Sequence, residues 1–241
     1  FRRVLFRSWV WIPLSIFAAL MQAVRTAAQK QLNQRMSTMG TTYVRSLFGI
    51  PFLLIFLGGA IAYTGRGLPA FTWPFVLHTF GGAFTQVVAT ALLIYLFRLK
   101  NFAVGTMLTK TDLILTAMIG TVLFTELVTP LGWVAIVVVM CGVTLMLLGK
   151  TGTGLFRTRG EALAHLLFGR PTLVALACAL MFSFSYLFLR AATLALGPDN
   201  HFLWRAGWTV VLANTMQIVF LGLWLAAKEP AVFREMWPLR G

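Results

Sequence analysis

The stretch Thr42–Tyr63, TYVRSLFGIPFLLIFLGGAIAY, decides the fold class. It contains a single charged residue, Arg45, and most of its other side chains are aliphatic or aromatic. An α-helix needs about 20 consecutive, mostly apolar residues to cross the hydrocarbon core of a bilayer. A run of this length, with its one charge near the start, is therefore predicted to be a membrane-spanning helix.

Similar runs recur along the whole chain. They are separated by short turns rich in Gly, Pro, Asn and charged residues, such as residues 64–69 and 197–200. We therefore expect an all-α fold, a polytopic transmembrane helix bundle. The seven expected spans are Trp9–Ala28 (extending toward Leu32), Thr42–Tyr63, Pro74–Phe97, Phe102–Leu127, Leu131–Leu148, Pro171–Leu196 and Phe202–Ala227.

Composition supports a membrane protein and argues against a soluble one. The chain has 241 residues, of which 59% are hydrophobic and 11% charged, whereas soluble domains are about 45–50% apolar and about 25% charged. The net charge is +14, but the cations stand at the ends of the apolar runs, where they face lipid headgroups. This placement does not indicate nucleic acid as a partner. Two cysteines and three scattered histidines form no metal-binding pattern, and no cofactor is expected.

An internal repeat relates the two ends of the chain. When the sequence is shifted by 160 residues, one tripeptide recurs and two cations coincide with cations. The matches are Ala19-Leu20-Met21 with Ala179-Leu180-Met181, Lys30 with Arg190, and Arg45 with Arg205. The first two spans are therefore expected to resemble the sixth and seventh.

This repeat predicts an inverted architecture. A first unit of five spans has an odd number of crossings, so a second, related unit enters the membrane from the opposite side, as in many secondary transporters. We expect a first repeat at residues 1–150, a basic linker loop at 151–170, and the start of the second repeat at 171–241. By this logic seven of ten helices are present, and the chain is expected to be truncated.

Polar residues inside the spans recur on single helical faces. On the first span Gln22, Arg25 and Gln29 are spaced three and four residues apart, which places them on one face. Polar groups are costly in hydrocarbon, so such faces normally turn toward the bundle interior or a water-filled cavity. The residues expected to bind substrate are Gln22, Arg25, Gln29, Gln86, Lys110, Asp112, Tyr186, Arg190, Asn214 and Gln217. The alternative is that these side chains form interhelical packing contacts and hydrogen bonds.

Some charged residues are expected to have structural roles. Arg45 and Arg205 stand near the starts of their spans, where a long cation can reach the interface as an anchor. Glu126 closes the fourth span, where its charge opposes the helix macrodipole, so it requires a specific partner. Lys30, late in the first span, belongs to the same structural group.

The sequence resembles the EamA-type branch of the drug/metabolite transporter superfamily. The resemblance rests on AVGTMLTKTD at residues 103–112, Glu126, Gly132-Trp133 and Cys141-Gly142-Val143, with Lys30 and Arg45 in matching places. It implies ten helices in two inverted repeats, and export or exchange of small metabolites such as amino acids or drug-like compounds. Many members have a proline in the fourth helix, where this chain has Lys110-Thr111-Asp112.

The expected function is secondary transport by alternating access across the bacterial cytoplasmic (inner) membrane. The sequence contains no G-x-x-x-x-G-K-[ST] loop, so the energy would come from a gradient or from exchange. Asp112 is the acid placed well inside a span, which makes it the candidate proton carrier. The alternatives are a flippase for lipid-linked substrates and a non-transporting scaffold. No H-E-x-x-H or G-x-S-x-G motif indicates an enzyme.

Overall fold

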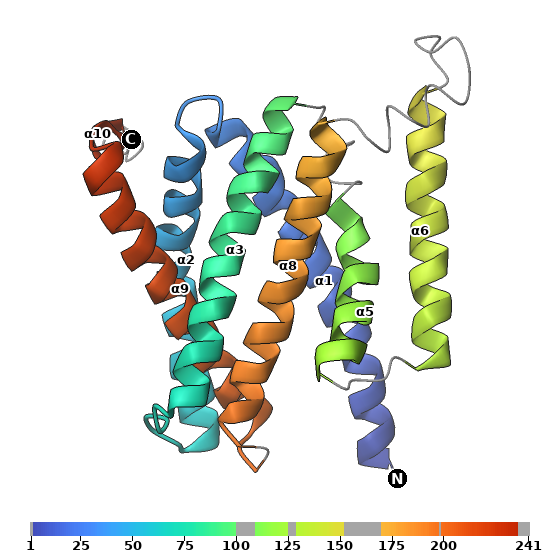
Figure 1. Cartoon of the computed structure of the whole chain (residues 1–241). Coiled ribbons are helices and arrows are strands. Elements are labelled where there is room, and N and C mark those ends of the chain that lie inside the picture. The colour runs from blue at the N-terminus through green and yellow to red at the C-terminus, as the bar shows by residue number, and fades with distance from the viewer. Residues whose placement is uncertain (1, 100–108, 125–128, 152–169, 198, 236–241) are drawn as a thin grey trace.

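The fold is a bundle of long helices, shown in Figure 1. The computed structural model describes residues 2–99, 109–124, 129–151, 170–197 and 199–235. Within these ranges the side chains of residues 2–11, 123–124, 143–144, 146–151 and 234–235 are not described. None of the described residues forms a β-strand, and the predicted all-α fold class is confirmed.

The helices follow the predicted spans, apart from an earlier start of the first and a difference in the fourth. Four described helices, α2, α3, α8 and α9, are long and apolar enough to cross a membrane by length and composition. The elements are α1 (Arg2–Leu32), α2 (Thr38–Thr64), α3 (Trp73–Leu99), the 3₁₀ turn η1 (Thr109–Thr111), α5 (Asp112–Phe124), α6 (Pro130–Thr151), α8 (Arg170–Ala195), α9 (Phe202–Lys228) and α10 (Ala231–Glu235).

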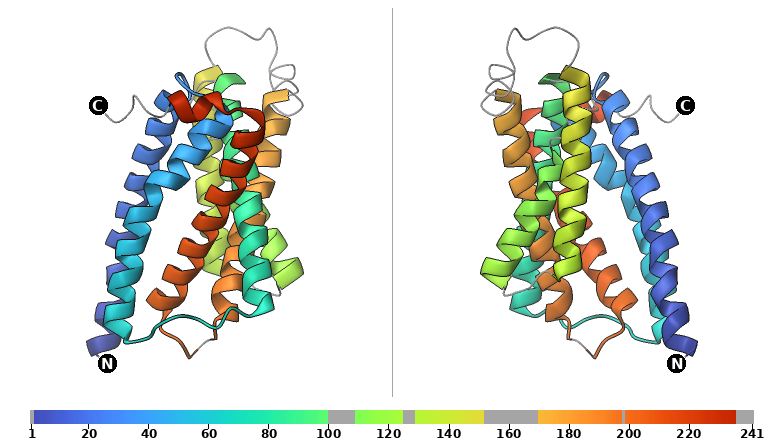
Figure 2. Two further views of the ribbon diagram at one scale, coloured as in Figure 1. Left: turned by 90° about the vertical axis from the view of Figure 1, so that its left-hand side faces the viewer. Right: turned by 90° about the vertical axis from the view of Figure 1, so that its right-hand side faces the viewer.

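Two helix pairs form the centre of the bundle. The most extensive contacts join α3 to α8 and α2 to α9, and α3 also packs against α9. Helices α5 and α8 are in contact as well, whereas α1 makes few contacts, with α2 and α3. Figures 1 and 2 show α6 at the edge of the bundle beside α5. The helices expected to begin a second repeat therefore pack directly against those of the first.

The ends of α2 follow from local capping chemistry. Its first turn is capped by Ser37, whose Oγ accepts a hydrogen bond from the Gly40 N–H at 3.1 Å. At its other end Gly65 adopts a left-handed conformation with φ of 66°, and its N–H donates to the Ile61 carbonyl at 2.8 Å. A residue without Cβ adopts this conformation at little cost, so Gly65 ends the helix there.

The fourth span departs from the expected continuous helix. Residues 100–108 and 125–128, including Glu126, lie outside the described residues. In the described part, Thr109–Thr111 form a 3₁₀ turn and Asp112 is the first residue of α5. Lys110 therefore belongs to the 3₁₀ turn and Asp112 to the α-helix that follows it. A change from 3₁₀ to α geometry alters the angle between neighbouring side chains, and both residues line the same pocket.

Helices α3 and α8 approach closely at Gly82. A Cβ added at Gly82 would lie 2.7 Å from Leu189 Cγ, and Ser185 Oγ donates to the Gly82 carbonyl at 3.1 Å.

Gly82→Ala is therefore expected to destabilise the protein by about 1–3 kcal/mol through overpacking. At Gly59, in α2, an added Cβ meets nothing within 4 Å. Gly59→Ala is the matched control, expected to be neutral or stabilising. Unfolding in mixed detergent micelles measures both, and equal stability of the two variants would contradict the close approach.

Candidate functional site

A pocket with polar groups in its lining lies between α1, α5 and α8, and its Gln22, Lys110 and Tyr186 residues are exposed. Its volume is about 370 Å³. Helix α1 contributes Gln22 and Thr26, and the short η1 turn contributes Thr109 and Lys110. The remaining lining residues are Ala19, Ala23, Leu93, Asp112, Phe182 and Tyr186. Side chains from the five elements α1, α3, η1, α5 and α8 thus meet around one space, although their positions in the sequence are far apart.

Asp112 supplies the carboxylate of this pocket. Its side chain is buried, with 7% exposed, and its Oδ1 atom has no hydrogen-bond partner among the described residues. Its backbone carbonyl accepts a hydrogen bond from Ser183 Oγ of α8 at 3.0 Å. The backbone is therefore held against α8, while one carboxylate oxygen remains able to accept a proton or a ligand donor.

Two aromatic residues of α8 belong to the lining of the pocket. The rings of Phe182 and Tyr186 are stacked, with centroids 6.0 Å apart and an interplanar angle of 15°. On α1, Arg25 Nη2 donates to Gln22 Oε1 at 2.5 Å, which orients the Gln22 amide. The pocket therefore combines an aromatic surface with amide, ammonium and carboxylate groups.

A second polar group joins α2, α3 and α9 by hydrogen bonds. Gln217 Oε1 accepts from Arg45 Nη2 at 3.3 Å and from Ser46 Oγ at 3.2 Å. Gln217 Nε2 donates to Gln86 Oε1 at 2.7 Å. Asn214 Nδ2 donates to the Ser46 carbonyl at 2.8 Å. Gln217, 2% exposed, thus connects three helices through one amide group.

Tyr186 lines the pocket, and 45% of its surface is exposed. It is within electrostatic range of Asp112, Arg25 and Arg45, and Arg45 is within range of Arg25. Tyr186 of α8 therefore interacts electrostatically with charged groups of α1, α2 and α5. In a low-dielectric environment such interactions are stronger than in water.

The other predicted residues lie outside the pocket. Gln29 is buried, and its Nε2 has no hydrogen-bond partner in the described part of the chain. Arg190 is exposed on α8, one turn beyond Tyr186, and Lys30 is partly buried on α1. Arg205, expected to be an anchor, is partly buried, and its Nε and Nη1 atoms have no partner among the described residues.

Sequence reasoning did not include Phe182, Thr26 or Ser46 among the binding residues. Phe182 reads as an ordinary apolar residue of a span, but its position four residues before Tyr186 places both rings on one helical face. Thr26 lies on the polar face of α1 already recognised in the sequence. Ser46 follows Arg45 directly, and no sequence pattern indicates that both reach Gln217.

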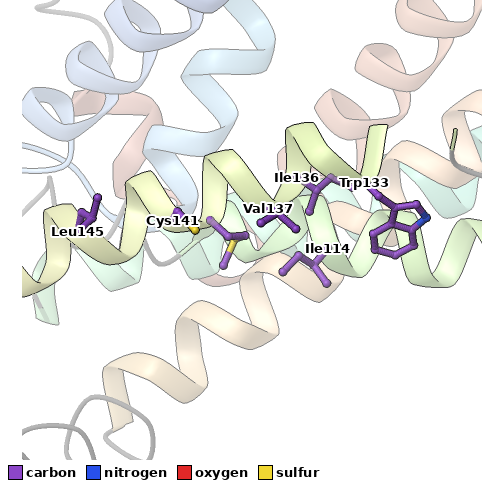
Figure 3. A pocket seen from close by; sticks show the side chains of 7 residues that line it. Ile114, Trp133, Ile136, Val137, Cys141 and Leu145 are labelled. Carbon is purple, nitrogen blue, oxygen red and sulfur yellow. The ribbon is translucent and has the colours of Figure 1, made fainter. Parts of the chain in front are cut away.

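A second pocket, of about 510 Å³, separates α5 from α6. Its side chains are almost entirely apolar, and Figure 3 shows Ile114 of α5 facing the side chains of α6. Cys141 belongs to this lining and is exposed. Without polar groups to orient a ligand, this space lacks the mixed lining of a specific binding site. The pocket around Asp112 is therefore the candidate functional site.

Comparison with known proteins identifies the chain's family. No curated protein and no solved structure matches the chain. The sequence profile of the EamA-like transporter family matches residues 9–148. That range contains α2, α3 and α5, together with the Gln22, Lys110 and Asp112 side chains of the pocket. The chain is an integral membrane protein of the EamA-like transporter family, and its function is of the membrane-transporter type.

Proposed function

We propose that the protein is a secondary transporter that moves small metabolites, such as amino acids or drug-like compounds, across the bacterial inner membrane by alternating access. The observation that carries this proposal is the pocket that Lys110, Asp112 and Gln22 line between α1, α5 and α8. Charged and amide groups at membrane depth normally mark a substrate or ion pathway, because they are costly to keep there. Substrate export or exchange would use a gradient, with Asp112 as the proton carrier.

The lining indicates how a substrate would be held. Lys110 provides a cation for a carboxylate or another anionic group. Gln22 provides an amide that both donates and accepts hydrogen bonds. The stacked rings of Phe182 and Tyr186 offer an apolar surface for the rest of the molecule. A volume of about 370 Å³ suits a compound of the size of an amino acid.

Alternating access would change the contacts between the two groups of helices. In the inverted-repeat interpretation, α8 and α9 begin the second unit, and they pack against α3 and α2 of the first. The hydrogen bonds of Gln217 to Arg45 and Gln86 cross this boundary. Polar contacts of this kind can exchange partners when one unit rocks against the other, which apolar packing does less readily. We likewise propose that residues 151–170 form the linker between the two repeats.

Transport in reconstituted vesicles tests the proposal. The purified chain is placed in proteoliposomes, and uptake of radiolabelled amino acids, of a fluorescent drug-like cation and of a lipid-linked amphiphile is measured with and without a pH gradient. Uptake above that of empty vesicles supports the proposal. Uptake confined to lipid-linked amphiphiles would contradict it and favour a flippase. No uptake of any compound would favour a scaffold.

Lys110→Gln is expected to raise the KM for a carboxylate-bearing substrate about tenfold, because one charge-assisted contact is worth about 1.5 kcal/mol. Lys110 is exposed at the pocket, so the variant is expected to fold normally. Arg170→Gln, which removes an exposed cation from the start of α8, is the matched control and should leave the KM unchanged. An unchanged KM in Lys110→Gln would remove this residue from the substrate site.

A further inference from the structure

A separate charged pocket lies at the end of the bundle where α1, α3 and α9 finish and α2 begins. Its volume is about 540 Å³, and Arg35, Arg98, Lys228 and Glu229 are among its lining residues. Figures 1 and 2 show α10 at this same end of the bundle, close to the α1–α2 turn. None of these residues lines the candidate transport site.

Apolar packing holds the walls of this pocket in place. Val232 of α10 forms one buried cluster with Met36 of the α1–α2 turn, Val44 of α2 and Leu225 of α9. A Cβ added at Gly40 would lie 2.8 Å from Val232 Cγ1, so α10 lies directly against the start of α2. Buried apolar contacts therefore hold α10 against the α1–α2 turn, the start of α2 and the end of α9, around the pocket.

The charges of the pocket favour an anion. Arg98 Nη2 donates to Asn33 Oδ1 at 3.3 Å, and Asn33 Nδ2 donates to the Ile94 carbonyl at 3.4 Å, which fixes the guanidinium beside the end of α1. Arg35 and Lys228 are exposed, and Glu229 is the single carboxylate that the pocket contains. The ends of α1, α3 and α9 contribute about half a negative charge each, and the start of α2 offsets one of them. A positive balance remains.

The position of the pocket identifies the source of the anion. It lies where membrane-spanning helices end, which is the level of the lipid headgroups. Trp224, one turn before Lys228 on α9, is 40% exposed, as expected of an aromatic side chain at the membrane interface. Basic pockets between helix ends bind the phosphates of anionic lipids. We propose that the pocket formed by Arg35, Arg98 and Lys228 binds the phosphate of an anionic phospholipid headgroup.

Lipid binding to the purified chain tests this site. The protein in a neutral detergent is titrated with short-chain phosphatidylglycerol, and bound lipid is measured by native mass spectrometry. Phosphatidylcholine with the same acyl chains is expected to bind more weakly. Arg98→Gln and Lys228→Gln are each expected to weaken phosphatidylglycerol binding about fivefold, because a cation near an anionic headgroup contributes about that factor. Equal affinity in these variants would overturn the proposal.

Two further variants separate charge from structural damage. Glu229 Oε2 is buried without a hydrogen-bond partner in the described part of the chain, so Glu229→Gln removes a repulsive charge with little change in shape. This variant is expected to bind phosphatidylglycerol several-fold more tightly, a gain that misfolding does not produce. Arg66→Gln removes an exposed cation that bonds Asn200 at the opposite end of the bundle, and it should bind as the unaltered chain does. Weaker binding to Glu229→Gln would contradict the proposal.

A competition experiment with inorganic phosphate shows whether the site prefers a lipid or a free anion. Phosphate at millimolar concentration is expected to compete only weakly with phosphatidylglycerol, because the lipid is also held by its acyl chains against the exposed apolar surface of the helices. Complete displacement by phosphate would show a site for free anions and would overturn the assignment to lipid.

Discussion

Replacing Asp112 by Asn is expected to abolish proton-coupled transport while the protein remains folded. The carboxylate is buried at the pocket, and its Oδ1 has no hydrogen-bond partner among the described residues. An amide of the same shape cannot take up and release a proton. Because Asn is accepted as readily as Asp at helix starts, the loss of charge in the first turn of α5 should cost only about 0.5 kcal/mol.

Proton-driven uptake and thermal stability should be measured on the same preparations of Asp112→Asn. Asp199→Asn is the matched control, because Asp199 is an exposed acid in the turn before α9. The control is expected to transport normally. Unchanged proton-driven uptake by Asp112→Asn would refute the coupling role. Loss of uptake that is accompanied by loss of folded protein would assign Asp112 a structural role instead.

Gln217→Leu is expected to have the largest effect on stability, a loss of about 3 kcal/mol. Leu has nearly the volume of Gln, but it leaves the Arg45 guanidinium and Gln86 Oε1 without the partner they have in Gln217, whereas Ser46 Oγ keeps its hydrogen bond to the Thr42 carbonyl. A buried polar group left unpaired costs about 1–3 kcal/mol, and more when it is charged. The same substitution at Gln31, which is exposed on α1, should change the stability by less than about 0.5 kcal/mol.

A double-mutant cycle shows whether the network acts as a unit. The cost of Gln217→Leu should fall when Gln86→Leu is also present, because one of the unpaired groups has been removed. Unfolding of the four proteins in mixed micelles measures this coupling. Strict additivity of the two changes would mean that Gln86 and Gln217 do not interact.

The positions of the long helices along the chain could be predicted, because the length of an apolar run can be read directly from the sequence. Thr42–Tyr63 and Phe202–Ala227 were predicted within a few residues of α2 and α9. The 3₁₀ turn at Thr109–Thr111 could not be predicted, because no proline or glycine occurs in those three residues. Its geometry depends on contacts with α8, which the sequence does not display.

The sequence predicted several of the polar residues that belong to the interhelical sites, but not which of them lie together. Helical spacing placed Gln22, Asp112 and Tyr186 on polar faces, and they line one pocket. The same reasoning treated Gln86 and Gln217 as substrate ligands, whereas they hydrogen-bond to each other. Arg45 near a helix start indicated an interfacial anchor, and its bond to Gln217 arises from the packing of α2 against α9. Periodicity gives the face of a helix, but not its partner.

The accessibility of Gln22 tests most directly whether the polar faces surround a substrate pocket. Gln22→Cys and Leu20→Cys are made in a chain with Cys141→Ser, because Cys141 is exposed while Cys178 is buried. Leu20 is exposed on α1 and lies outside the pocket lining. We expect a hydrophilic maleimide to label Gln22→Cys in the membrane, transported substrate to protect it, and Leu20→Cys to remain unlabelled. The pocket would be contradicted if the hydrophilic maleimide failed to label Gln22→Cys, and if a fluorophore attached there were quenched by spin-labelled lipids as strongly as one attached to Leu20→Cys.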